Sequence, residues 1–407
     1  MSFTVFSRAS SIRFACIAAL VLVAGCSRPS QQDIDGKALL DAARSDDLAA
    51  VKAQLAKGTN VNWKGKLDST PLIAASQQGN LDVVQVLLQH HADPNAKTSD
   101  GDFRPIILAA IGGYVPVINV LAAAHADIEA TDSSHLTALF WAAKMDKADA
   151  VKALLALHAS VDGSRKLGGT PLMVALAKNN TDIAQILIDA GANVNAISSA
   201  AGTPMIQAVM GHDLDGVRLL LANHADINLT APDGTTAVYA AADADQPEIM
   251  RVLIAAGGSA NTAKKDSSTP LMVAAQNGSE ASFNILMDAG ANVNATMRDG
   301  KTAMMFAAQH GESNIIYKLL DAHAPIDARA RDGNTALLIA AANLQIDSLR
   351  ELIDHHADVN AKDYEHPGHT ALDLANANND PQMQDKKEPV VNALEAAGAH
   401  SGLAPPD

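Results

Sequence analysis

Apolar and polar positions follow each other along this chain in a pattern that returns at a fixed interval. One segment in each interval is apolar and rich in alanine, as in residues 271–275 (LMVAA), and a second carries Ile or Leu at helical spacing, as in residues 183–188 (IAQILI). Small side chains let neighbouring segments approach closely, and the second spacing predicts an amphipathic helix. The pattern therefore predicts many short helices with small interfaces rather than one large core.

The interval is 33 residues, and a threonine followed by Pro or Ala marks its register. From Thr137 to Thr335 every step is 33 residues, and the units start near residues 37, 70, 104, 137, 170, 203, 236, 269, 302, 335 and 370. Thr suits the cap of a helix, and Pro suits its first turn. A turn such as Asp299-Gly300 supplies the Gly for a tight reversal before each Thr. The chain from about 35 to 400 is thus predicted to contain about eleven repeated units.

These units resemble the ankyrin repeat, which has a β-turn and two antiparallel helices every 33 residues and a Thr-Pro-Leu signature. The resemblance implies an all-α solenoid, an array of about 11 helix–turn–helix units joined by β-turns, in which stacked units share one continuous core. It also implies that the first helices line a concave face.

Two features depart from the family pattern. The His that usually follows Thr-Pro-Leu is replaced, and we expect the substitutes to fill gaps between stacked units; the alternative is an exposed stripe for a partner. The substitutes are Ile73, Ile107, Phe140, Met173, Ile206, Tyr239, Met272, Met305 and Leu338. The last unit contains an insertion at residues 376–389. We expect it to form a polar loop in the C-terminal cap, and the alternative is a docking loop.

Histidine recurs just past the second helix, where other units have glycine. The residue there is Gly58, Gly191, Gly257, Gly290 or Gly398, or else His91, His125, His158, His224, His323 or His356. Helices commonly end there in a left-handed residue, and His is among the residues enriched at positive φ. Equivalent His residues lie a whole layer apart, roughly 10 Å, so they predict helix ends and no metal pocket. The alternative is a zinc or copper site from His355, His356, His366 and His369.

The N-terminus has the pattern of an export signal. Arg8 and Arg13 precede an apolar run at residues 14–24, and residues 22–26 (LVAGC) resemble a bacterial lipobox. The sequence therefore predicts a signal peptide at 1–25, lipidation of Cys26, a short linker at 26–34 and a tail at 401–407. Two or more acyl chains anchor a protein stably. By resemblance to enterobacterial sorting, Ser27 predicts the outer membrane, facing the periplasm.

Composition excludes several classes of function. The net charge is −15, with 45 acids and 30 bases, which disfavours nucleic acid. Cys16 lies in the predicted signal, so with Cys26 lipidated no thiol remains in the mature chain. The chain has no Gly-x-Ser-x-Gly elbow, Gly-rich phosphate loop or His-Glu-x-x-His helix. We expect no enzyme and no cofactor.

These observations predict a monomeric, membrane-anchored binding module whose concave face holds a protein partner. Large or apolar residues near the turns and late in the first helices are the expected contacts. They are Trp63, Phe103, Ile111, Lys144, Met145, Met210, Gln309 and His310. A scaffold or chaperone-like role for envelope proteins is the leading expectation. The alternatives are an immunity protein against a basic periplasmic toxin, and a metal-binding or structural envelope protein.

Overall fold

The computed structural model describes residues 30–163, 169–364 and 368–402, so the predicted signal, Cys26 and His366 lie outside it. Within these ranges, twenty-two α-helices follow one another in eleven pairs. The first helices of the pairs are α1 (Gln31–Arg44), α3 (Pro71–Gln78), α5 (Pro105–Gly112), α7 (Ala138–Lys144), α9 (Pro171–Ala177), α11 (Pro204–Met210), α13 (Ala237–Asp243), α15 (Pro270–Gln276), α17 (Ala303–His310), α19 (Ala336–Ala342) and α21 (Ala371–Ala377). The second helices are α2 (Leu48–Ala56), α4 (Leu81–Gln89), α6 (Val115–Ala123), α8 (Ala148–Ala156), α10 (Thr181–Asp189), α12 (Leu214–Ala222), α14 (Pro247–Ala255), α16 (Glu280–Asp288), α18 (Ser313–Asp321), α20 (Ile346–Asp354) and α22 (Gln384–Ala396).

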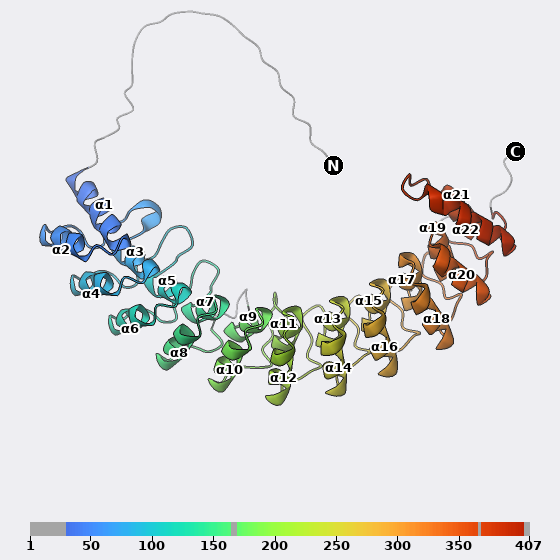
Figure 1. The fold of residues 1–407 in the computed structure, drawn as a ribbon, viewed down its shortest axis with the longest axis horizontal. Helices are drawn as coiled ribbons and strands as arrows, with labels where there is room; N and C mark the ends of the chain where they lie inside the picture. Colours follow the sequence, from blue (N-terminus) through green and yellow to red (C-terminus); the bar gives the residue numbers. More distant parts are fainter. Residues whose placement is uncertain (1–29, 164–168, 365–367, 403–407) are drawn as a thin grey trace, which may run out of the picture.

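The pairs stack into a curved array. Figure 1 shows an arc in which the odd-numbered helices line the inner side and the even-numbered helices lie outside. A short 3₁₀ helix, η1 (Lys66–Asp68), and isolated bridges between Thr131 and Thr137 and between Ser198 and Gly202 belong to the turns between units. The predicted all-α solenoid of eleven units is confirmed.

The repeated threonine begins most of the first helices as the sequence predicts, while Ser30 and Arg104 stand at this place before α1 and α5. Thr70 Oγ1 accepts a hydrogen bond from the N–H of Ile73 at 3.2 Å, which satisfies one of the free donors of the first turn. The same bond recurs in seven further units, at Thr137, Thr170, Thr203, Thr236, Thr269, Thr302 and Thr335. Behind these caps the alanines of the first helices and the branched residues of the second are buried, as with Ala109 and Leu121. Each interface therefore closes through small side chains.

The end of each second helix confirms the predicted left-handed residue. The six histidines there have φ between 58° and 67°, and the five glycines have φ between 75° and 91°. A second left-handed position, just after the first helix, was not predicted from the sequence. There φ is positive even at Leu344 (52°) and His212 (56°). The short reversals between helices thus need positive φ twice in most units.

The residues that replace the family's His are part of the core. Eight of the nine are at most 6% exposed, and Tyr239 is half-buried. The expectation that they fill gaps between units is confirmed, and the alternative of an exposed stripe is wrong. Each lies at the third position of its first helix, where the side chain meets the neighbouring unit.

Both ends of the array differ from their predicted bounds. Helix α1 begins at Gln31 with Ser30 as its cap, so the predicted linker at 26–34 is partly helical. Residues 384–389 of the insertion, predicted as a loop, form the start of α22, and Pro389 is accommodated inside it. The first two residues of the predicted tail pack on the fold, because Ser401 and Gly402 donate hydrogen bonds to the carboxylate of Asp373 at 2.6 and 2.8 Å, and residues 403–407 lie outside the described residues.

An asparagine ladder joins successive units behind the second helices. In five units the side-chain N–H of an asparagine donates to the carbonyl of the left-handed His or Gly that ends the next second helix. The side-chain oxygen of the same asparagine accepts the backbone N–H of the residue two positions after that His or Gly. These asparagines are Asn62, Asn95, Asn228, Asn261 and Asn360. The side-chain oxygen of Asn294 cannot accept the equivalent hydrogen bond, because the residue at the donor position is Pro325, which has no N–H. The recurring His therefore contributes its backbone to the ladder.

Candidate functional site

A groove lined by both apolar and polar side chains lies on the inner side of the first three units. Its volume is about 490 Å³, and its walls include Leu67, Ile73, Phe103 and Leu108, with the cations Arg44 and Lys66 also lining it. All of these residues come from first helices or turns, so the groove opens toward the inside of the arc. Leu67 is 48% exposed at φ 60°, which places an apolar side chain at a strained turn.

Trp141, on helix α7, continues this groove along the array. Its indole N–H donates to Asp132 Oδ2 at 2.8 Å, and its ring lies 6.0 Å from that of Phe103, tilted by 59°. The ammonium of Lys144 lies 4.5 Å from the centre of the ring. The carboxylate of Asp132 is buried and also accepts the N–H groups of Ser134 and Leu136. Trp141 is thus a half-buried aromatic residue held from three sides.

The predicted contact residues divide between structural and exposed positions. Trp63 packs over Gly36, where an added Cβ would lie 2.3 Å from its ring, and its indole N–H donates to Asp33 at 3.3 Å. It therefore closes the first unit. Ile111 is half-buried against the core at the end of α5. Phe103 and Lys144 both lie against Trp141.

The remaining predicted contacts are exposed. Met145 and Met210 are 40% and 61% exposed at the ends of α7 and α11. Gln309 and His310 are exposed at the end of α17. His310 Nδ1 lies 3.0 Å from the carbonyl of Phe306, and the carbonyl of Gln309 accepts from Gln345. The structure thus brings Phe103 and Lys144 together and leaves Gln309 and His310 several units away.

The histidines proposed as an alternative metal site have other roles where the structure describes them. His355 Nδ1 lies 3.2 Å from Glu351 Oε1 and packs edge-on against Tyr317. His356 ends a helix at φ 67°, and the carbonyl of His369 accepts a bond from Asp363. Among the described residues, no group of three His, Cys, Asp or Glu side chains is placed to hold a metal ion.

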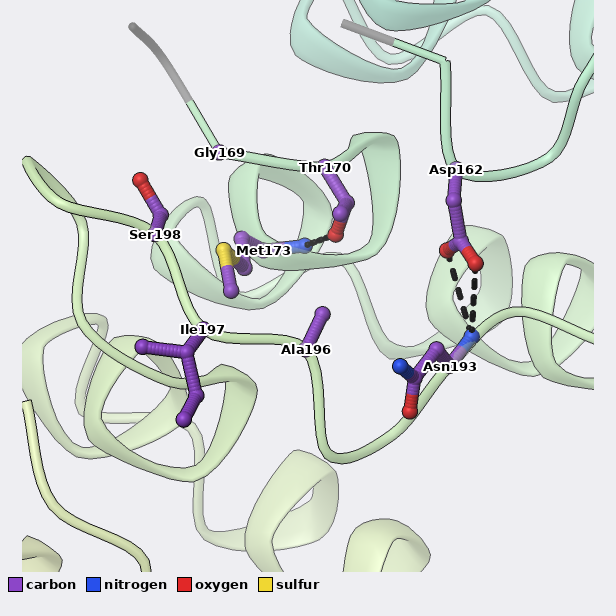
Figure 2. A pocket seen from close by; sticks show the side chains of 8 residues that line it. All are labelled: Asp162, Gly169, Thr170, Met173, Asn193, Ala196, Ile197 and Ser198. Carbon is purple, nitrogen blue, oxygen red and sulfur yellow. Dashed lines mark hydrogen bonds between the residues drawn. The ribbon is translucent and has the colours of Figure 1, made fainter. Parts of the chain in front are cut away.

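The residues that line a small pocket between units five and six make contacts that stabilise the fold. Figure 2 shows Met173 and Ile197 beside it, with Asp162 accepting the N–H of Asn193 and Thr170 accepting that of Met173. Its volume is about 120 Å³. The two hydrogen bonds drawn are the N-cap of α9 and a link between successive units. Both are structural, so they do not indicate a catalytic or ligand-binding site in this pocket.

The turns of units seven to eleven form a second, different surface. Each turn donates a backbone N–H to the turn before it, from Lys265 to Asp233, Arg298 to Asp266, Arg331 to Asp299 and Tyr364 to Asp332, at 2.7–3.3 Å. The aspartates are also bound by their own turns; Asp233 accepts the N–H of Thr235 and pairs with Lys264 at 3.2 Å. The backbone bond to Thr235 is the main cause that lowers the pKa of Asp233. The side chains of Lys265, Arg298 and Arg331 are exposed.

Sequence reasoning missed Trp141 and the three exposed cations, although both left a signal. Trp141 is one of two tryptophans and lies four residues after the repeat Thr, a position that was not considered. Lys265, Arg298 and Arg331 each lie four residues before the Thr of their unit. Both signals are positions in the 33-residue register rather than residue types.

Family comparison agrees with this geometry. A family model described as ankyrin repeats (3 copies) matches residues 11–98, 39–132, 106–198, 205–297 and 292–363. The chain belongs to the ankyrin repeat family. Ankyrin repeats are interaction modules that hold protein partners, and this is the function class that the family match supports.

Curated relatives match short stretches of the chain. The chain is 43% identical over 80 residues to the mitochondrial disaggregase of Homo sapiens, covering 20% of this chain and 11% of that protein. It is 38% identical over 82 residues to the ankyrin repeat and KH domain-containing protein mask-1 of Caenorhabditis elegans, covering 20% and 3%. The chain thus spans a small part of the relatives that it matches. In the described ranges, no helix has the length and apolar character required to span a bilayer.

Proposed function

We propose that this chain is a lipid-anchored envelope protein that holds another protein on the inner side of its array. The observation that carries the proposal is Trp141, an aromatic residue fixed by Asp132, Phe103 and Lys144 beside a groove of about 490 Å³ that Phe103 also lines. Binding hot spots are enriched in Trp residues held in well-packed surroundings. A rigid Trp loses little side-chain entropy on binding, so it is suited to anchor a partner.

The location of the protein is a second part of the proposal. The basic and apolar signal pattern ending at Cys26 supports export and lipidation, with the outer membrane facing the periplasm as the expected site. Because α1 begins at Gln31, the chain between Cys26 and the array is only a few residues long. The array would therefore work close to the membrane surface.

The proposed role is scaffolding or chaperone-like support of envelope proteins. One relative is named a disaggregase, and it shares a stretch of 80 residues of repeats with this chain, which favours a role toward other proteins. A second candidate is an immunity protein. The net charge of −15 favours it, because an acidic array suits a basic toxin.

Site-directed photo-crosslinking in intact envelopes tests the binding face. A crosslinking residue at Met145 or Met210, on the inner side, is expected to give one discrete adduct, whereas Lys152 and Arg218, on the exposed faces of α8 and α12, give none. Trp141→Ala should abolish the inner adduct and Trp141→Phe should retain part of it. Equal adducts from both faces would contradict the proposal.

The identity of the crosslinked protein separates the two roles. A resident envelope enzyme supports scaffolding, and a toxin supports immunity. For the anchor, loss of fatty-acid labelling in Cys26→Ser is the expected result, and unchanged labelling would refute lipidation at this residue.

A further inference from the structure

Three cations form a single file on successive turns of the C-terminal half. We call Lys265, Arg298 and Arg331 the basic row. All three are exposed, and each backbone N–H donates to the carbonyl of the aspartate in the preceding turn, at 2.9, 3.3 and 2.7 Å. These bonds fix the backbone of the row in register with the repeat. Its members are therefore spaced by one unit, roughly 8–10 Å.

The carboxylates nearest to the basic row are already engaged. Asp299 accepts the N–H of Lys301 and pairs with the ammonium of the same residue at 3.4 Å. Asp266 accepts the N–H of Ser268 at 2.9 Å, a bond that is the main cause lowering the pKa of Asp266. Within residues 30–163, 169–364 and 368–402, no member of the row forms an ion pair with a carboxylate. The row thus keeps its charge available in a chain whose net charge is −15.

We propose that the basic row binds a linear acidic segment of the protein partner, with carboxylates spaced about 10 Å apart. A segment in the polyproline II conformation has three residues per turn and rises about 3.1 Å per residue, so this spacing corresponds to an acidic residue at every third position, all on one face. In a helix with a rise of about 1.5 Å per residue, it corresponds to every seventh position. The inference rests on the proposed protein-binding function and gives the partner its chemistry.

A segment of protein suits the row better than an anionic bilayer. Lipid-binding sites are dense clusters of about 4–8 Lys and Arg residues. Here the three cations stand one per unit, a much lower density than in such a cluster. A single file of charges instead matches a single chain laid along the turns, at right angles to the helices.

Fluorescence anisotropy with full-length protein tests the proposal. The probes are two fluorescein-labelled peptides, one with Glu at every third position in a Ser/Gly background and one helical peptide with Glu at every seventh. The row variant is Lys265→Glu/Arg298→Glu/Arg331→Glu. The control is Lys152→Glu/Arg218→Glu/Arg251→Glu, which changes the net charge equally at exposed positions of α8, α12 and α14.

We expect wild type and control to bind one of the peptides at low salt and the row variant to bind it about tenfold more weakly or worse. Circular dichroism should show that both variants keep the wild-type melting temperature. Equal binding by the row variant and the control, or no binding of either peptide by wild type, would overturn the proposal. Row-dependent capture by phosphatidylglycerol vesicles without peptide binding would assign the row to a membrane and overturn it too.

The two proposals fail in different ways. If the row variant keeps the crosslinked adduct at Met145 that Trp141→Ala loses, and binds the peptides normally, protein binding stands and only the acidic segment is wrong. If crosslinking residues at Met145 and at Met210 give no adduct in the otherwise unchanged protein, the protein-binding function itself is contradicted.

Discussion

The two halves of the array offer a partner different surfaces built on one backbone. In the first six units Phe103, the fixed ring of Trp141 and the exposed Met145 and Met210 present apolar side chains. In the second half Ala240 and Val273 stand where Trp141 stands in α7, followed in the next two units by the half-buried Phe306 and Ile339. The turns of this half present the basic row. The repeat signature sets the fold in both halves, and the positions that it leaves open set the surface.

The largest expected loss of stability comes from Leu→Ala changes in the core, and comparing such a change in each half tests whether the halves share one core. Leu154 in α8 and Leu286 in α16 are both fully buried at the same place in their units. Each Leu→Ala change should cost about 2–5 kcal/mol, because the cavity cannot close in a stacked array. Urea unfolding followed by circular dichroism checks this. If one change costs nothing while the other is severe, the two halves do not share a common core.

The C-terminal end should respond to acid. Burial by itself would raise the pKa of Asp373, but hydrogen bonds from Ser401, Thr370 and Gly402 outweigh it and lower the pKa below 3.8. A group with a lowered pKa stabilises the fold above its unfolded value, and this stability is lost as pH falls through the folded value. Asp373→Asn should cost about 1–3 kcal/mol near neutral pH. The difference from wild type should shrink below pH 3.8, the ordinary value; melting curves at each pH measure it, and a constant difference would contradict it.

A smaller effect compares intact and interrupted steps of the asparagine ladder. Asn228 donates to the carbonyl of Gly257 at 3.2 Å and accepts the N–H of Ser259 at 2.9 Å. At the equivalent register of Asn294 the donor position is Pro325, which has no N–H. Asn228→Ala should lower stability by about 1–2 kcal/mol and Asn294→Ala by much less. Pro325→Ser supplies the missing N–H. In that background the loss of stability from Asn294→Ala is expected to match the loss from Asn228→Ala. Equal losses from the two alanine changes would show that the ladder contributes nothing.

The fold could be predicted from the sequence because its signals repeat. One Thr, one left-handed helix end and two helical patterns recur so often that a weak signal in one unit is corrected by the others. The ends lack neighbours on one side, and there prediction was wrong: Gln31 begins a longer α1, and residues 384–389 extend α22.

The candidate site was predicted only in part, for a physical reason. Exposed Met145 and Met210 follow from their position at the end of a first helix, but the role of Trp63 depends on Gly36 in a different helix. Trp141 likewise contacts Asp132, Phe103 and Lys144, which come from two different units. Contacts between units set the surface, and sequence spacing alone does not give side-chain directions.

The difference between the halves is tested most directly by the salt dependence of crosslinking in isolated envelopes. One crosslinking residue is placed at Met145 and another at Ser267, in the turn next to the basic row. Apolar contacts gain or lose little in salt, whereas exposed charges are screened within about 3 Å at 1 M. We predict that the Met145 adduct persists from low to high salt while the Ser267 adduct falls severalfold. Parallel loss of both adducts, or a salt-resistant adduct at Ser267, would contradict the account.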